Sequence, residues 1–423
     1  MHEPQLEEAT EAYVDGDVAL TPGTARAALA HRDFRVVWLG ALSSSVGTWM
    51  QNVVLSAFAF ELTKSPTFVG IVYFAGLGPS LLIAVVGGVM ADVFDRRKLL
   101  IIANFEQLVF SALLAWFARG SDPSHVGIVL CVAMVGVGQA FNGPTYSSLL
   151  PELVGRRDLA GAVSLQSTQM NVARVIGPAI GGVLYPVVGA AWVFFFNALT
   201  YLFAVVSVAI ITLAPRDVPV NDVRGWRRLV SGFVIARRDA LVRRILVTMS
   251  LFSFFSLTFI GLMPVLAADN LGMRPKSLAY GLLYASFGTG AAIGAVSIGT
   301  FLAGASKPRI VQRGMAAFAV LLGVFAVERI DALAYPTIVV LGFVYFASVT
   351  SLSTVLQEHL EDHVRGRVMA LWMMSFGGMV PLGTLALSPV ADHLSVTFVA
   401  LVGAAVAGVL AWYADLRAVG APG

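Results

Sequence analysis

Two ionisable residues lie deep within apolar stretches of the sequence, Glu106 and Arg174. A charge inside a bilayer costs at least about 2.5–3.5 kcal/mol, so each needs a partner or contact with water. The arginine could bind an anionic group or keep a nearby carboxylate charged, or it could donate to backbone at the bend of Pro178. A glutamate buried without a partner suits proton exchange, whereas a hydrogen-bonded one serves its own helix bundle. These readings stay open at this point.

Polar and aromatic residues at helical spacing are further candidates for a ligand path. One stripe contains Gln51 and Asn52, and another contains Gln139 and Asn142. Residues three or four positions apart share a helix face. Later stretches carry aromatic side chains, which include Phe254 and Tyr345. A path with many aromatic and few charged groups suits an amphipathic or lipophilic compound, although the phenylalanines would serve equally well against lipid.

Motifs for other chemistry are missing from the sequence. It contains no GxxxxGK[ST] loop, no cluster of metal ligands and no nucleophile motif, and Cys131 is its single cysteine. ATP-driven transport within the chain and enzymatic activity are therefore disfavoured. We expect no cofactor, no bound metal and no nucleic-acid partner.

The composition indicates which solvent surrounds these residues. Of 423 residues, 57% are hydrophobic and 13% charged, against about 45–50% and about 25% in soluble domains. Lipid can solvate such a chain, and we predict an all-α polytopic membrane protein. Twelve apolar stretches are long enough to span, at about residues 36–60, 67–91, 98–118, 125–149, 161–188, 191–213, 244–268, 277–302, 310–327, 333–356, 367–391 and 394–415.

The basic residues predict the orientation of these spans. With both termini on one side, 22 of the 28 Lys and Arg residues fall on that side and five on the other. The positive-inside rule therefore predicts cytoplasmic termini in a bacterial inner membrane. At about 1.5 Å per residue, Arg174 then lies about 20 Å and Glu106 about 12 Å from the interior surface. A direct pair between them would need a long reach and adjacent helices.

The longest interior loop divides the spans six and six. We predict a disordered tail at 1–30, six-helix bundles at 31–213 and 244–416, a linker at 214–243 with an amphipathic helix, and a C-terminal tail at 417–423. Within the linker, Trp226, Leu229 and Phe233 share a face, as in a helix at the headgroup surface, although a solvated basic linker is the alternative. Prolines at 178 and 186 recur at an offset of 203 residues, as in two parallel repeats.

Two motifs resemble signatures of a transporter family. The segment from Gly88 through Asp92 to the basic cluster of Arg96 and Arg97 resembles the loop signature of the major facilitator superfamily, with Asp95 in place of the usual glycine. A second segment is similar to the antiporter signature of exporting facilitators, in which small residues and proline permit a bent, closely packed helix. It consists of Gly177, Pro178, Ala179, Ile180, Gly181 and Gly182.

Segments around Glu152 and Arg365 resemble a branch with enterobactin exporters, macrolide efflux proteins and transmembrane secretion effectors. The resemblance implies two six-helix bundles, a path lined by spans 1, 4, 7 and 10, and ion-driven export, usually with protons. Drug antiporters often carry an arginine where this chain has Gly136, so their proton-coupling group cannot be carried over.

We therefore predict a monomeric exporter of a small amphipathic compound, drug or siderophore-like, coupled to protons. An inner gate would be latched by Asp92, Arg96, Arg97, Glu152 and Arg156 of the first half with Arg365 and Arg367 of the second. The alternatives are a lysophospholipid flippase, an uptake carrier, or a membrane enzyme or scaffold that transports nothing.

Overall fold

The computed structural model describes residues 21–93, 95–212 and 225–419, without the side chains of 82–93, 225–231 and 362–363. Most of the predicted N-terminal tail, residues 214–224 of the predicted linker, the last four residues of the C-terminal tail, and the surroundings of Gly88 and the side chain of Asp92 therefore lie outside the described residues.

Every regular element in these ranges is a helix, which agrees with the predicted all-α fold. The first half comprises α2 (Ala25–Ala30), α3 (Arg32–Thr63), α4 (Pro66–Val93), α5 (Arg96–Phe117), α6 (His125–Val188) and α7 (Ala190–Ala209). The second half comprises α8 (Gly225–Arg238), α9 (Ala240–Leu251), a π segment (Phe252–Ser256), α10 (Thr258–Gly261), α11 (Met263–Leu271), α12 (Leu278–Ser297), α13 (Lys307–Val327), α14 (Asp331–His359), α15 (Asp362–Met373), a second π segment (Met374–Gly378), α16 (Met379–His393), α17 (Val396–Tyr413) and a 3₁₀ turn (Leu416–Val419).

Nine helices in the described residues are long and apolar enough to cross a membrane. One of them, α6, has 64 residues, and its helical geometry is broken at Gly155, where φ is 69°. The chain folds back at this glycine. A hydrogen bond across the break shows this, since Gln166 donates to Ser147 at 2.9 Å. The element therefore contains the fourth and fifth predicted stretches, while the total of twelve spans stays a prediction.

Polar caps set where several helices begin. Ser124, Ser277 and Ser395 accept from backbone N–H groups in the first turns of α6, α12 and α17. Asp95, the departure from the family motif, accepts from the N–H of Lys98 at 3.1 Å and caps α5. The aspartate at this position therefore has a local structural role as the N-cap of α5.

The prediction of a disordered tail is wrong for its last six residues, which form α2. The oxygen of Thr24 caps this helix, and Ala28 is fully buried. Asp158 in α6 accepts from the N–H of Gly23 at 2.9 Å and lies 3.0 Å from the His31 ring. These bonds hold the pKa of Asp158 below its usual value, the bond to His31 having the largest effect. This segment is therefore ordered by bonds to Asp158, which lies 135 positions after Gly23 and 127 positions after His31 in the sequence.

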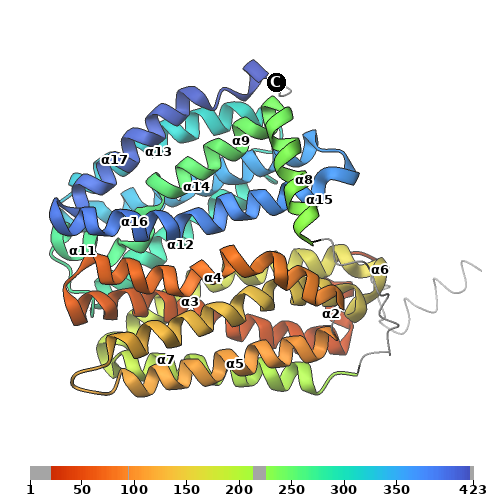
Figure 1. Cartoon of the computed structure of the whole chain (residues 1–423), viewed down its shortest axis with the longest axis horizontal. Coiled ribbons are helices and arrows are strands. Elements are labelled where there is room, and N and C mark those ends of the chain that lie inside the picture. The colour runs from red at the N-terminus through yellow and green to blue at the C-terminus, as the bar shows by residue number, and fades with distance from the viewer. Residues whose placement is uncertain (1–20, 94, 213–224, 420–423) are drawn as a thin grey trace, which may run out of the picture.

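The helices form two groups, as Figure 1 shows, with α3 to α7 on one side of the molecule and α9 to α17 on the other. The helix α2 and the described C-terminal end lie at the same end of the molecule. We call this end the terminus side and the opposite end the far side. The first helix and the last turn that the structure describes are thus on one side.

Two helix pairs, α4 with α16 and α6 with α12, make the most extensive contacts between the halves among the described residues. In the second pair a Cβ on Gly281 would lie 2.0 Å from the Cα of Gly182, so the backbones touch. Small residues are the usual means of such approach in membranes. In the first pair, a Cβ on Gly70 would lie 2.0 Å from the hydroxyl oxygen of Ser388. We call these two contacts the α4–α16 seam and the α6–α12 seam.

Candidate substrate and proton sites

The side chain of Arg174 lies between the two halves. Its guanidinium carbon is 5.3 Å from the ring centre of Trp49 in α3 and 4.3 Å from that of Phe346 in α14. Its Nη1 donates to Asn171 at 3.3 Å. Cation–π contacts of this kind contribute about 0.5–2 kcal/mol, more where water is excluded. The arginine is thus held by one ring from each half.

No acid forms an ion pair with Arg174 among the side chains that the structure describes. The direct pair with Glu106 that the sequence left open is therefore not formed. The described bond to Asn171 uses one of five guanidinium N–H donors. A bond from Arg174 to the backbone at Pro178 is likewise not among its described contacts. Donors remain available for an anionic ligand.

The glycine motif around Pro178 allows close packing on two faces of α6, next to Arg174. A Cβ on Gly177 would lie 2.6 Å from that of Trp49, and one on Gly181 3.1 Å from the carbonyl oxygen of Met50. The motif's Gly182 forms the α6–α12 seam. The helix α6 therefore lies against α3 of its own half and α12 of the other, as its small residues indicated.

Two polar stripes continue from this site toward the terminus side. On α6, Ser164, Ser167 and Asn171 share the face of Arg174, and the two serines are exposed. On α14, Thr350, Ser353 and Gln357 share the face of Phe346 and become more exposed toward the end of the helix. The α6 stripe was not predicted from the sequence, although its helical spacing was a usable signal. The resemblance to major facilitators pointed to spans 1, 4, 7 and 10 instead.

The polar residues chosen from α3 and α6 form a network inside the first half. Gln51, 2% exposed, accepts from Asn197 at 2.8 Å. Gln139 accepts from Gln107 at 3.0 Å, and Asn142 donates to Asn104 at 3.0 Å. The structure therefore does not bring these residues together with Arg174. Asn52 is half-buried one residue along α3.

Glu106 borders this network and has no described hydrogen bond. Both of its carboxyl oxygens are buried without a partner among the described residues. The side chain occupies space left by Gly138 in α6, where a Cβ would lie 2.1 Å from the Oε2 atom. Its neighbour Gln107 bonds to Gln139. Of the two alternatives that the sequence left open, a hydrogen bond of Glu106 within its own bundle is not among its described contacts.

Of the aromatic candidates, Tyr345 belongs to a cluster of rings in the second half, and Phe254 pairs with Phe255. Tyr345 is 5% exposed and lies 5.9 Å from Phe287 and 4.5 Å from Phe346 between ring centres. Phe254 is half-buried beside Phe255, with 4.8 Å between ring centres. Tyr345 therefore supports the ring that contacts Arg174.

The predicted gate residues lie at the terminus side, and their described contacts stay within one half. Arg96 pairs with Glu152 at 2.7 Å, and Arg97 donates to the carbonyl groups of Val208 and Ala209 at the end of α7. In the second half, Arg365 donates to the carbonyl of Leu360 at 3.3 Å. Arg156 is exposed and Arg367 half-buried. A latch across the halves stays a prediction.

Comparison with known proteins identifies a family and relatives that this chain resembles. Residues 23–419 match the family described as transmembrane secretion effector. The chain is 26% identical over 349 residues to a staphyloferrin A transporter of Staphylococcus aureus, covering 82% of this chain and 86% of the relative. It is 27% identical over 351 residues to an enterobactin exporter of Shigella boydii, covering 81% of each.

Solved structures show the same fold at low sequence identity. A nucleoside transporter has a TM-score of 0.73 at 14% identity, covering 92% of this chain and 99% of the other. An inward-facing bacterial homologue of the human lysosomal transporter Spinster has a TM-score of 0.71 at 12% identity, covering 92% and 98%. The chain therefore belongs to the transmembrane secretion effector family of major facilitator transporters and is a multi-pass membrane transporter, not an enzyme.

Proposed function

We propose that the protein exports a small amphipathic compound with a negative charge, by alternating access and in exchange for protons. The observation that carries the proposal is Arg174, a charged group between the halves with no described acid partner. A charge in such a place needs a partner or water, and an anionic substrate group supplies the partner. The rings of Trp49 and Phe346 supply an apolar surface for the rest of the molecule.

The position of Arg174 suits alternating access. Arg174 and Trp49 belong to the first half and Phe346 to the second, so movement of the halves changes the contact with Phe346. A ligand that binds the two arrangements differently shifts the balance between them. The inner latch of Asp92, Arg96 and Arg156 with Arg365 and Arg367 would form when the site opens to the far side.

Proton exchange is assigned to Glu106. A carboxyl that is buried without a cation or hydrogen bond costs least as the neutral acid. It would release its proton when movement of α5 against α6 admits water to the space beside Gly138. The amide network of Gln107 and Gln139 offers polar groups next to this carboxyl. We propose H⁺ as the coupling ion and the monomer as the working unit.

The relatives support a siderophore-like cargo over a drug. Those named for staphyloferrin A and enterobactin each align with more than four fifths of this chain. Both names refer to siderophores. An anionic, partly aromatic metal chelator would satisfy the guanidinium and both rings of the site.

Two transport probes that differ in charge test whether the substrate must carry a negative charge. In energised inside-out vesicles containing the protein, a fluorescent aromatic carboxylate should accumulate at least five times faster than its neutral amide, after subtraction of the rate in vesicles without the protein. The measurement is fluorescence inside filtered vesicles over time. Equal rates for the two probes would refute an anionic substrate, and loss of the carboxylate from preloaded vesicles would indicate an uptake carrier instead.

Thiol labelling tests the proposed orientation, with cytoplasmic termini in the inner membrane. With Cys131 replaced by alanine, a single cysteine at Asp122, exposed between α5 and α6, should react with an impermeant maleimide in intact cells. One at Arg238, exposed at the end of α8, should react only after permeabilisation. Native Cys131, 4% exposed, is the matched control and should stay unlabelled in both conditions. The reverse pattern would overturn the orientation and the meaning of export.

A further inference from the structure

A carboxylate of the second half caps a helix of the first half at the far side. One oxygen of Asp392, at the end of α16, accepts from the N–H of Thr67 at 2.8 Å. The same oxygen accepts from the hydroxyl of Ser65 at 3.0 Å and from that of Thr67. The helix α4 begins at Pro66, so Asp392 satisfies a backbone N–H group in its first turn. A capping residue normally belongs to the same chain segment, but this one lies 325 residues away.

The cap lies at the outer end of the α4–α16 seam. One turn along α4, Gly70 packs against Ser388, one turn before Asp392 on α16. Further along the same seam, Gly378 contacts Leu81. These residues come from opposite halves, so the contacts of the row that lie nearest the far side must separate when the transporter opens there. Among the side chains of this row that the structure describes, Asp392 makes the directional polar contact and the others make van der Waals contacts.

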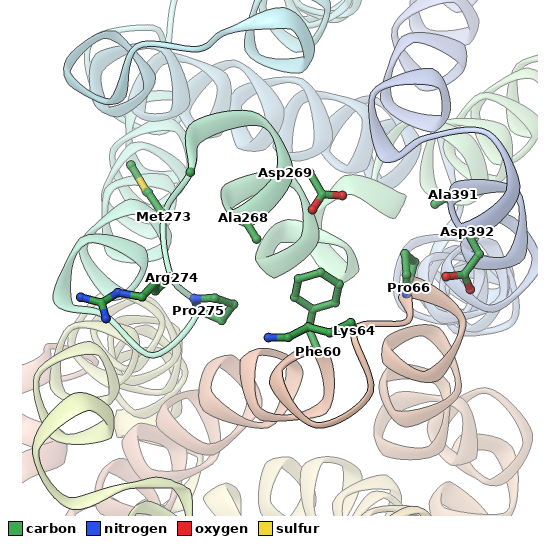
Figure 2. Close-up of a pocket in the computed structure, with 11 residues that line it drawn as sticks. Phe60, Lys64, Pro66, Ala268, Asp269, Met273, Arg274, Pro275, Ala391 and Asp392 are labelled. Atoms are coloured by element: carbon green, nitrogen blue, oxygen red, sulfur yellow. The ribbon is translucent and has the colours of Figure 1, made fainter.

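The place where this seam ends borders a cavity. A cavity of about 480 Å³ lies between the halves beside the cap and is lined by residues that include Phe60, Lys64, Asp269 and Asp392. Figure 2 shows Asp392 next to Pro66 at one side of the cavity, with Lys64 and Asp269 nearer its centre. Asp392 itself is exposed. Water can therefore replace the bonds of the cap at small cost, which is what a contact that forms and breaks in each cycle requires.

We propose that Asp392 is the far-side latch, a positioning residue that holds the halves closed at that side and sets how often they open. The latch rests on the proposed alternating access and adds a second gate to the one predicted at the terminus side. The cap combines a charge-assisted bond with attraction between a carboxylate and a helix N-terminus. It stabilises only the arrangement with the far side closed, because opening takes Asp392 away from α4.

Distance measurements between spin labels test the latch without any substrate. In a protein with Cys131 replaced by alanine, one label pair is placed at Val187 and Leu278 on the far side and another at Ala160 and Glu358 on the terminus side, all exposed positions. Asp392→Ala should raise the far-side-open fraction about fivefold, the size expected for loss of an ordinary N-cap. The terminus-side pair should shorten in the same fraction of molecules.

Two variants separate the latch from general damage to the fold. Asp392→Asn keeps an oxygen that accepts from Thr67 but loses the charge, so its far-side-open fraction should lie between those of the parent and of Asp392→Ala. The double variant Ser65→Ala, Thr67→Val removes the two hydroxyl donors from the other half and should move the balance in the same direction as Asp392→Ala. Asp122→Asn, an exposed acid of the far-side loop between α5 and α6, is the matched control and should change nothing.

The outcomes distinguish the latch from the transport cycle. If the parent shows two populations and Asp392→Ala leaves their ratio unchanged in monodisperse protein, the latch is wrong while alternating access stands. If each pair shows one distance in the parent and in every variant, alternating access fails as well. If Asp392→Ala does not fold, the Ser65→Ala, Thr67→Val variant decides alone.

Discussion

Replacement of Arg174 by glutamine should lower export of the carboxylate probe by at least tenfold, while replacement by lysine should retain part of the activity. Glutamine keeps hydrogen-bond donors but removes the charge, and a hydrogen bond to a charged group contributes about 1.5–3 kcal/mol, or roughly 10- to 100-fold in rate. Lysine keeps the charge but loses the flat surface that lies against Trp49 and Phe346. The measurement is initial export rate in energised vesicles, normalised to purified, monodisperse protein.

The comparison of these two variants distinguishes a binding role from a structural one. If the planar guanidinium matters only as a spacer between Trp49 and Phe346, lysine should do no better than glutamine, and melting temperature should fall with activity. Arg119→Gln, at an exposed position beyond α5, is the matched control and should export at the parent rate. Parent rates in the Arg174→Gln variant would remove the arginine from the mechanism.

Glu106→Gln should abolish export driven by a pH gradient, with at least a tenfold loss, and leave exchange of substrate down its own gradient largely intact. Glutamine has nearly the shape of the protonated acid and fits the space beside Gly138, but it cannot release a proton. The measurement is flux in proteoliposomes with an imposed pH gradient, compared with flux under a substrate gradient alone.

A variant on the facing helix gives an independent check of this assignment. A Cβ at position 138 would lie 2.1 Å from the Glu106 carboxyl, so Gly138→Ala should displace it and weaken coupling in the same direction. Glu328→Gln, at a half-buried acid just after α13, is the control. If Glu106→Gln retains full pH-driven export, the proton is carried by another group.

Local patterns predicted those features that depend on one helix and its solvent. The apolar stretches correspond to helices, and the glycines around Pro178 lie where helices touch. Arg174 stood out because a charge is rare in a span, and it lies between the halves. Helical spacing, lipid exposure and the cost of a buried charge all act within a few residues, and a sequence displays them directly.

Features that depend on which helices are neighbours could not be predicted in this way. Periodicity placed Gln51 on a polar face, yet it could not say that this face meets Asn197 in α7. The cap from Asp392 to Thr67 joins residues 325 positions apart, and an aspartate near the end of a span has no local mark of that role. The order of α2 likewise depends on Asp158, far along the chain. In each case a partner from a distant segment decides the role.

The break of α6 at Gly155 has a mechanical consequence. One arm of this element carries Gly138, the wall of the Glu106 space, and the other carries Arg174, and a single glycine in a non-helical conformation separates their helical geometry. The two arms are therefore two helices joined at a hinge, and the hinge consists of the φ and ψ angles of Gly155. If the arms move as rigid helices, movement of one is passed on to the other, and this would couple the proposed anion site at Arg174 to the proposed proton site at Glu106.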